Sequence, residues 1–311
     1  MEQERLAHNS FQETHIPFYE GREQYFNTIN SYLANSHPSP IVIFGPSGSG
    51  KTALLCNWST QFSSTYHSTL IITHYVGCTT SSSNLESTIL RIIQEIKNFY
   101  KLDLPIPQQL EQITESLATW FMEASRRGGL ILVIDGIDKL SQNSSNPAPT
   151  SQNSEISWLP TLPPHVHLIT TMTKNAKISG PLFSNQRNHR KLNIKPLTEM
   201  EKMKIVHNFT EFYGKKLSNE MVENIVYAEQ TSNPLYLRIF LDELRMFGDF
   251  QGLYERISHY LDAQNVSQLI EFVLERIEDI MKRISKTNVV EGVLSCLWVS
   301  RGGLLQDEII N

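Results

Sequence analysis

The sequence of 311 residues is poor in cysteine and has no long hydrophobic run. Its three cysteines, Cys56, Cys78 and Cys296, lie far apart without CxxC spacing, which argues against a disulfide framework and against a zinc site. No apolar run approaches the roughly 20 residues of a membrane-spanning helix, and the first residues contain no hydrophobic core of a signal peptide. We therefore expect a cytoplasmic protein in a reducing compartment, without a membrane span.

An excess of basic residues is also absent. The sequence has 27 Lys and Arg against 32 Asp and Glu, a formal net charge of −5. Proteins that coat nucleic acids are generally basic, so this balance argues against a nucleic-acid partner. Apolar residues make up 40% and charged residues 19%, as in ordinary soluble globular proteins, and the length allows one large domain or two modest ones.

Short apolar runs alternate with helical patterns in the first two thirds of the sequence. The runs with the length of buried strands are 41–44, 70–76, 130–134, 166–171 and, more weakly, 191–194. Between them, apolar residues recur at helical spacing over 85–96 and 110–124. Alternating strands and helices predict βαβ units and a parallel sheet.

From Leu197 the strand patterns stop and amphipathic helices follow. The expected helices cover about 198–213, 218–229, 234–247, 252–262 and 266–285. The low-complexity segment 141–156 is expected to be a disordered loop, because it is too polar to offset the entropy cost of ordering. The sequence stops directly after the apolar-rich stretch 304–310, so we expect a piece of a longer protein.

One motif indicates specific chemistry. Residues 45–52, GPSGSGKT, match the G-x-x-x-x-G-K-[ST] pattern of a P-loop in full, between a buried strand and a helical pattern. The glycines let backbone N–H groups point at phosphate oxygens, and the following helix adds the positive end of its dipole. Lys51 would reach the β- and γ-phosphates, and the Thr52 hydroxyl would ligate Mg²⁺. The predicted phosphate-binding residues are Gly45, Pro46, Ser47, Gly48, Ser49, Gly50, Lys51 and Thr52. The alternative is a Gly/Ser-rich turn, which the flanking strand and helix disfavour.

Acidic residues follow the clearest strand pattern. Asp135 comes directly after 130–134, and a carboxylate at the carboxyl end of a buried parallel strand faces the ligand crevice. We predict that Asp135 holds Mg²⁺ through water; the alternative is a solvated aspartate at a strand end. Asp138 either polarises the attacking water, shapes the outer ligand shell of the metal, or caps the next short helix. The strand 166–171 ends in hydroxyls, which either place a γ-phosphate sensor or mark a plain strand end.

Together these features resemble the nucleotide-binding core of STAND-class NTPases of the NACHT branch, and within it nephrocystin-type, telomerase-associated and NACHT–WD-repeat proteins. The segments that carry the resemblance are 19–23 (YEGRE), the P-loop, 74–78 (HYVGC), 135–138 (DGID), 196–198 (PLT), 233–237 (NPLYL) and 300–304 (SRGGL). The resemblance implies an α/β fold: a P-loop NTPase with a parallel sheet of the ASCE type, followed by a helical domain and the start of a winged-helix domain.

The resemblance also implies domain limits and further binding residues. The implied segments are an N-terminal strip bordering the nucleotide site (1–40), the P-loop NTPase domain (41–196), the helical domain (197–265), and a linker helix with a truncated winged-helix-like segment (266–311). Gly21 and Arg22 match the family's strip that borders base and ribose. Pro234, in the family's G-x-P-like motif, would pack on the adenine. On sequence alone, Pro234 could simply start a helix.

For function, the resemblance implies a signalling switch that binds ATP or ADP with Mg²⁺. Slow hydrolysis would be coupled to domain rearrangement and to assembly with protein partners or copies of itself, through regions outside these 311 residues. Two positions depart from the family's pattern: Lys139 replaces an acidic residue, and Thr171, Thr173 and Lys174 stand where many relatives have an arginine. Both departures disfavour fast hydrolysis more than nucleotide binding.

Three other functions stay open at this point. A scaffold could retain nucleotide as a structural ligand without turnover, which Lys139 favours. A small-molecule P-loop kinase needs an Arg-rich lid, and the candidate lid 141–154 contains no arginine. A DNA-loading ATPase of related architecture is disfavoured by the net charge of −5.

Overall fold

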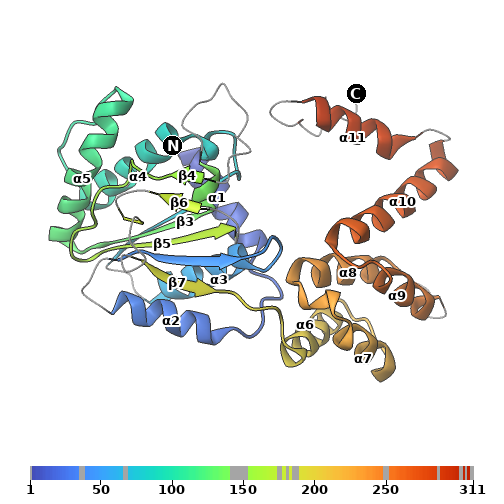
Figure 1. Ribbon diagram of the computed structural model, residues 1–311. Helices are drawn as coiled ribbons and strands as arrows, with labels where there is room; N and C mark the ends of the chain where they lie inside the picture. Colours follow the sequence, from blue (N-terminus) through green and yellow to red (C-terminus); the bar gives the residue numbers. More distant parts are fainter. Residues whose placement is uncertain are drawn as a thin grey trace. The chain divides into compact units, whose positions relative to one another are not determined.

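The computed structural model describes residues 2–34, 39–65, 69–140, 153–173, 177–179, 182–183, 189–247, 252–285, 288–300, 304 and 307–308. The chain divides into two compact units, Met1–Lys195 and Pro196–Asn311 (Figure 1). None of the helices in the described part of the chain combines the length and apolar character that crossing a membrane requires.

A five-stranded parallel sheet forms the centre of the first unit. Its strands are β1 (Ile41–Gly45), β2 (Leu70–Tyr75), β3 (Leu130–Asp135), β5 (Val166–Thr173) and β7 (Arg190–Asn193). They lie in the order β2-β3-β5-β1-β7, and all neighbouring pairs are parallel. All five expected strands are therefore present, and β5 separates the P-loop strand β1 from β3, as expected for the ASCE type. The weak pattern of β7 has a simple cause: it is an edge strand and mostly exposed.

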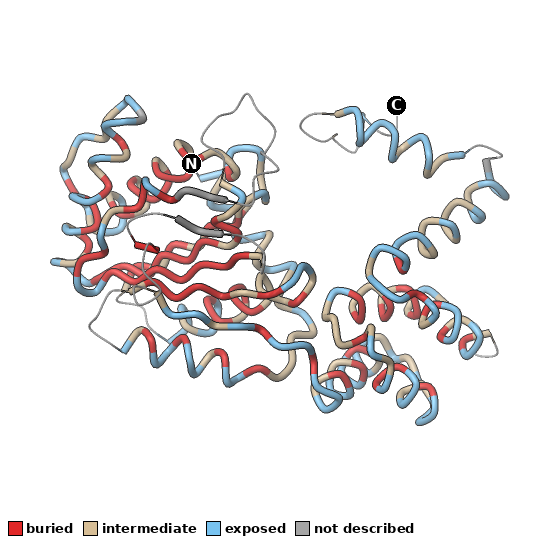
Figure 2. The backbone as a smooth tube through the Cα atoms, viewed as in Figure 1, coloured by how far each residue is buried: buried red, intermediate tan, exposed pale blue. Residues whose placement is uncertain are grey.

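Helices cover both faces of the sheet, as Figure 1 shows. On one face α2 (Glu23–Leu33) and α3 (Lys51–Thr65) pack against Ile41 and Ile43 of β1 and Val133 of β3. On the other face α4 (Leu85–Tyr100) and α5 (Leu110–Arg127) pack against Val42 and Leu132. Because successive side chains of a strand point to opposite faces, burial on both faces gives the continuous apolar runs of the sequence. Figure 2 shows the resulting buried strands at the centre of this unit.

Two regions of the first unit add to what the sequence indicated. The described part of segment 1–40 contains two helices, α1 (Glu2–Thr14) and α2, and its position beside the nucleotide stays a prediction. The prediction of a disordered loop over 141–156 is wrong at its C-terminal end, because β4 (Asn153–Glu155) pairs in parallel with β6 (Lys177–Ser179). Ile156, directly after β4, is buried. Local polarity could not indicate this pairing, because its partner strand is far along the chain; residues 141–152 lie outside the described residues.

The second unit is helical. Its helices are α6 (Glu199–Phe212), α7 (Asn219–Tyr227), α8 (Pro234–Met246), α9 (Leu253–Leu261), α10 (Val266–Ser285) and α11 (Val289–Val299). The first three begin after capping residues, Thr198, Ser218 and Asn233, whose side chains accept hydrogen bonds from backbone N–H groups of the first turn. The five expected helices are all present, which the strong caps and regular apolar spacing explain.

Helix α9 packs on α7 and α8, α10 packs on α8, and α11 packs on α10. Arg276 of α10 forms an ion pair with Glu243 of α8 at 2.7 Å. The expected boundary between residues 265 and 266 stays a prediction, as does the winged-helix start, because 301–303 of the SRGGL segment lie outside the described residues.

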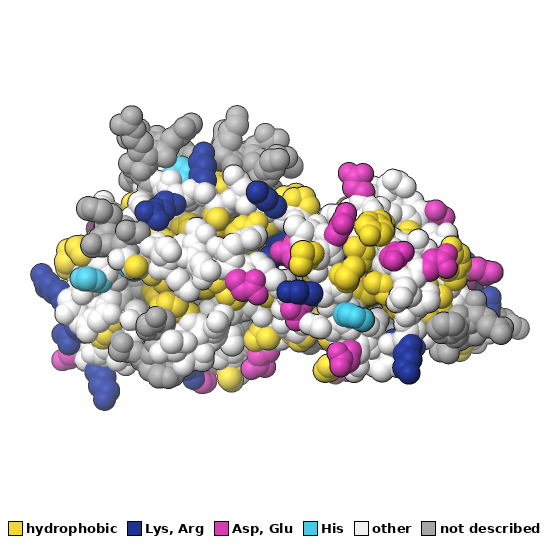
Figure 3. Space-filling model, turned by 90° about the horizontal axis from the view of Figure 1, so that it is seen from below, with side chains coloured by type: hydrophobic (Ala, Val, Ile, Leu, Met, Phe, Trp, Pro, Cys, Tyr) yellow, Lys and Arg dark blue, Asp and Glu magenta, His cyan; other side chains and the backbone are white. Residues whose placement is uncertain are grey.

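The surface carries charges of both signs. Figure 3 shows Lys and Arg side chains spread singly over one face, together with Asp and Glu side chains and small apolar areas. In that view the described residues form no large basic area, which agrees with the net charge of −5.

Candidate functional site

The P-loop joins the carboxyl end of β1 to the amino end of α3. Gly48 and Gly50 have φ angles of 75° and 88°, a left-handed conformation that only glycine adopts readily. The Ser49 N–H donates to the Pro46 carbonyl at 3.3 Å, which closes the turn ahead of the helix. A Cβ atom at Gly45 would lie 2.5 Å from the Ser49 Oγ, so glycine leaves the room that this hydroxyl fills. The loop is therefore a compact turn at a helix N-terminus, which is the backbone arrangement of a phosphate site.

Lys51, the first residue of α3, folds back over this turn. Its Nζ donates to the carbonyl oxygens of Gly45 at 2.8 Å and Pro46 at 2.9 Å. Burial lowers the pKa of the Lys51 ammonium, and the nearby carboxylates of Asp135 and Asp138 oppose this effect. The ammonium is therefore half-buried among carbonyls of the loop and close to two acidic groups, and its contact with a phosphate stays a prediction.

Asp135, the last residue of β3, is held by hydroxyl groups from two neighbouring elements. Thr52 Oγ1 of α3 donates to Asp135 Oδ2 at 2.7 Å, and Thr171 Oγ1 of β5 donates to Asp135 Oδ1 at 2.5 Å. The Gly136 N–H in turn donates to Thr171 Oγ1 at 2.8 Å, so the threonine hydroxyl is itself oriented. A hydroxyl beside a carboxylate at the end of a parallel strand is a donor set that suits hydrated Mg²⁺ bound to phosphates.

Asp138 is held by the same strand. It lies inside the short helix η2 (Ile137–Lys139), whose N-cap is Gly136, so it does not cap that helix. Its Oδ2 accepts hydrogen bonds from Thr173 Oγ1 at 3.0 Å and from the Thr173 N–H at 3.3 Å. Thr171 and Thr173 are two residues apart, on one face of β5, and each orients one aspartate. For the hydroxyls that end the strand 166–171, the sequence left open a γ-phosphate sensor or a plain strand end, and it did not indicate that Thr171 and Thr173 bind the two aspartates; Lys174 lies outside the described residues.

Of Gly21 and Arg22, Arg22 contacts the P-loop through its side chain. Both have left-handed backbone conformations, with φ of 70° and 66°. The Arg22 side chain is buried, and its guanidinium donates to the carbonyl oxygens of Ser49 at 2.9 Å and Lys195 at 3.1 Å. The sequence did not indicate these two carbonyl partners, because backbone acceptors leave no trace in residue types. Contact of Gly21 and Arg22 with base and ribose stays a prediction.

Pro234 belongs to the second unit and is the first residue of α8. Asn233 Oδ1 accepts from the N–H groups of Leu235 at 2.9 Å and Tyr236 at 3.4 Å, which makes Asn233 the N-cap. The alternative role of Pro234 as a helix start is therefore present in the structure. Its packing on adenine stays a prediction.

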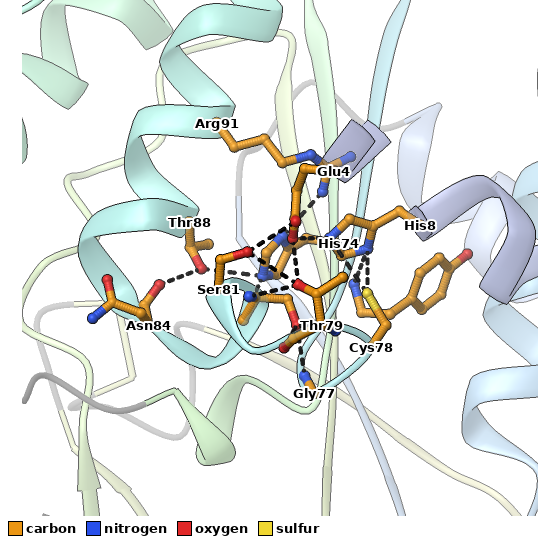
Figure 4. A network of polar contacts seen from close by, with 12 residues as sticks. Glu4, His8, His74, Gly77, Cys78, Thr79, Ser81, Asn84, Thr88 and Arg91 are labelled. Atoms are coloured by element: carbon orange, nitrogen blue, oxygen red, sulfur yellow. Dashed lines mark hydrogen bonds and ion pairs between the residues drawn. The ribbon is translucent and has the colours of Figure 1, made fainter. Parts of the chain in front are cut away.

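A second polar cluster lies where α1 meets the end of β2 (Figure 4). Glu4 of α1 accepts from the hydroxyls of Thr79 at 2.6 Å and Ser81 at 2.8 Å. His8 Nδ1 accepts from the Tyr75 N–H at 3.1 Å, and the Cys78 Sγ lies 3.2 Å from the same nitrogen. Because Tyr75 is the β2 neighbour of Asp135, the cluster joins α1 to the strand beside the candidate magnesium site.

The cluster continues to α4 through His74. His74 Nε2 donates to the Ser82 carbonyl at 2.8 Å, and its Nδ1 accepts from Arg91 at 3.0 Å. Burial, together with the nearby Arg91 charge, lowers the pKa of His8 to about 2 and that of His74 to about 4. Both rings are therefore neutral and serve as hydrogen-bonding groups.

Metal binding by protein side chains alone is not supported in the described ranges. They contain no group of three or more His, Cys, Asp or Glu side chains that could hold an ion. Magnesium in a P-loop site does not need such a group, since phosphates and waters complete its shell.

Comparison with known proteins places these features in a family context. The NACHT domain profile matches residues 39–212. A TPR repeat-containing protein of Dictyostelium discoideum is 28% identical over 368 residues, and human nephrocystin-3 is 26% identical over 320 residues. These alignments cover 97% and 99% of this chain but 22% and 23% of the two relatives, so the chain spans less than a quarter of their length.

Among solved structures, a Walker-type ATPase of Pyrococcus abyssi superposes with a TM-score of 0.51 at 13% identity, covering 93% of this chain and 87% of that one. At this identity the likeness concerns the fold alone, which is that of a P-loop ATPase.

Proposed function

Because the chain belongs to the NACHT domain family and has the fold of nucleotide-binding P-loop NTPases, we propose that it is an ATP/ADP-dependent signalling switch. In this proposal the bound nucleotide, with Mg²⁺, sets the arrangement of the two units, and slow hydrolysis resets it. The arrangement in turn controls assembly with protein partners in the cytoplasm. A switch of this kind requires the two arrangements to bind ATP or ADP with different affinity.

The observation that carries the proposal is the hydrogen bond of 2.7 Å between Thr52 and Asp135, which joins the P-loop helix to the end of β3 across 83 residues. We assign the phosphates to the loop 45–50 and to Lys51, and Mg²⁺ to the Thr52 hydroxyl and, through water, to Asp135. The metal would neutralise phosphate charge. The residues present fit it, since a hydroxyl and an oriented carboxylate lie side by side beside an ammonium.

For hydrolysis we assign Asp138 the role of polarising the attacking water. Its carboxylate is oriented by Thr173 and lies close enough to Lys51 to influence the lysine's pKa. Lys139 adds a positive charge directly after it, where many relatives have an acidic group, which supports slow rather than fast turnover.

The direct test is equilibrium binding of Mg-ATP to the wild type, Lys51→Ala and Asp135→Ala. We expect each variant to lose roughly tenfold or more in affinity, about 1.4 kcal/mol, because each removes a charged contact made to phosphate or metal. Lys101→Ala and Asp103→Ala serve as matched controls, since both residues are exposed in the same unit. Unchanged affinity in both site variants would refute the proposal.

A nucleotide-bound scaffold without turnover is the second candidate, favoured by Lys139. Single-turnover hydrolysis of Mg-ATP by the wild type and Asp138→Asn separates the two. A slow rate that falls in the variant supports the switch, whereas bound ATP that persists unchanged in both proteins supports the scaffold.

A further inference from the structure

We propose that Arg22 is a positioning residue that ties the backbone of the P-loop to the segment joining the two units. This inference rests on the proposed nucleotide-dependent switch and names the part of the first unit that passes the signal on. It differs from a role in binding the base, because the guanidinium acts through two backbone carbonyl groups.

Arg22, the residue directly before α2, is buried in an uncommon backbone conformation. Its side chain is 4% exposed and its backbone has φ of 66°, a conformation that is rare for residues other than glycine. One terminal nitrogen donates to the Ser49 carbonyl of the P-loop at 2.9 Å, and the other donates to the Lys195 carbonyl at 3.1 Å. A rigid, planar guanidinium holds two acceptors at a fixed separation, which a flexible lysine cannot do.

The same element holds Lys195 a second time. The Lys195 N–H donates to the Tyr25 hydroxyl at 3.0 Å, and Tyr25 lies one helical turn from Arg22, whose guanidinium is 5.9 Å from the tyrosine ring centre. Both peptide groups of Lys195 are thus bound to the start of α2. Lys195 is the last residue of the first unit.

The buried positive charge of Arg22 should make this residue sensitive to a phosphate bound at the P-loop. Among the ion pairs of the described residues, none includes Arg22, and its donors meet neutral carbonyl groups instead. A buried cation without a carboxylate partner stabilises negative charge nearby, and the P-loop that it contacts is the proposed phosphate site. Breaking either carbonyl contact would leave a buried donor unsatisfied, so a shift of the Ser49 carbonyl is expected to carry Lys195 with it.

The chain beyond Lys195 is held equally closely within the second unit. Pro196 follows, with a φ angle fixed by its ring, and the Leu197 N–H donates to the Ser232 carbonyl at 2.9 Å. Lys202 Nζ donates to the hydroxyl of the same Ser232 at 3.2 Å. Ser232 is the last residue of the short helix η3 (Gln230–Ser232), which leads directly into Asn233 and α8. Leu197 is therefore fixed to the second unit only two residues after Lys195, and the proline between them has restricted backbone freedom. A displacement of Lys195 is thus expected to act on Leu197 and its partner Ser232.

The test is hydrogen exchange of the Lys195 and Leu197 amides in the chain of 311 residues, with Mg-ADP or with the non-hydrolysable analogue Mg-AMP-PNP. In the wild type we expect exchange at these amides to differ between the two nucleotides. In Arg22→Lys, which keeps the charge but not the two-pronged geometry, we expect this difference to shrink about tenfold. Nucleotide affinity should change much less than in Lys51→Ala.

Tyr25→Phe is the second variant and Arg5→Lys the control. Tyr25→Phe removes only the acceptor of the Lys195 N–H, so it should weaken the exchange difference and leave affinity unchanged. Arg5 is exposed on α1, and its variant should behave as the wild type. An exchange difference that survives in both Arg22→Lys and Tyr25→Phe, or that is absent from the nucleotide-bound wild type, would overturn this inference but not the proposed function. Failure of the wild type to bind either nucleotide would instead refute the proposed function.

Discussion

The two aspartates of the candidate site are positioned by hydroxyl groups of one strand. Thr171 binds the Asp135 carboxylate and Thr173 binds that of Asp138, so the side chains of β5 orient both acidic groups. Outer-shell partners of this kind fix the direction in which a carboxylate offers its lone pairs to a metal. Thr171 is therefore as much a part of the site as the residues expected to touch Mg²⁺.

Thr171→Val tests this role. It keeps the shape of the side chain but removes the hydroxyl that orients Asp135, so we expect a loss of about 10- to 100-fold in the affinity for Mg²⁺ in the presence of ATP. Thr170→Val is the matched control, because the neighbouring Thr170 hydroxyl is also buried but donates to the Ile134 carbonyl. The measurement is a magnesium titration of ATP binding. Equal effects of the two substitutions would mean that the loss comes from general destabilisation of β5.

At the level of the helices, α1 is attached mainly through buried polar contacts, whereas α8 begins at a side-chain cap. Most helices of the first unit bury apolar residues, but the only buried residue of α1 is His8. Hydrogen bonds of Glu4, His8 and Gln12 attach this helix to β2, α3 and the segment after β2. A helix attached through buried polar groups depends on the protonation of those groups.

We expect the stability of the first unit to fall in acid because of this attachment. His8 and His74 have folded-state pKa values of about 2 and about 4, against an ordinary value of 6.5. Below pH 6.5 the unfolded chain binds protons that the folded chain rejects, so stability is complete above this pH and falls as the pH decreases toward 4. The slope should approach about 1.4 kcal/mol per pH unit for each histidine.

Urea unfolding as a function of pH measures this slope. His8→Gln should flatten it by about one proton, because glutamine does not titrate. His165→Asn is the control, since His165 is exposed in the same unit and its left-handed φ of 62° suits asparagine. An unaltered pH profile in His8→Gln would show that His8 does not provide the acid sensitivity.

Helix α8 depends on its cap. Asn233→Ala removes the oxygen that accepts from the Leu235 N–H at 2.9 Å, and should lower the stability of the second unit by about 1 kcal/mol. Asn233→Ser keeps a capping oxygen and should cost much less. Denaturant unfolding compares the two variants, and equal stabilities would argue that the cap contributes little.

At the level of the whole molecule, the division into two units predicts how nucleotide stabilises the protein. Calorimetry should show one unfolding transition for Met1–Lys195 and another for Pro196–Asn311. Mg-ATP at about 100 times its dissociation constant should stabilise the unit that binds it by about 2.7 kcal/mol. If Pro234 packs on the adenine, the transition temperature of the second unit should rise as well, and Pro234→Ala should reduce that rise. A shift of the first transition alone would contradict the role of Pro234 and leave the phosphate site intact.

Much of this architecture follows from local patterns in the sequence. The five strands of the sheet, the P-loop and the first helices of the second unit all carry signals within a few residues, namely apolar runs, the GPSGSGKT spacing and capping residues. Such signals are local because burial on both strand faces, a phosphate-binding turn and a helix start each depend on adjacent residues. The N-terminal helices gave weaker signals, since α1 is attached through polar groups.

The contacts between distant segments could not be obtained in this way. The pairing of β4 with β6, the hold of Thr171 and Thr173 on the two aspartates, and the two carbonyl contacts of Arg22 all join parts of the chain that are far apart. Their geometry depends on strand order and on backbone acceptors, which every residue possesses and which residue identity therefore cannot reveal. Residue types along the chain thus indicate which groups are available for nucleotide chemistry, and folding alone brings those groups within hydrogen-bonding distance.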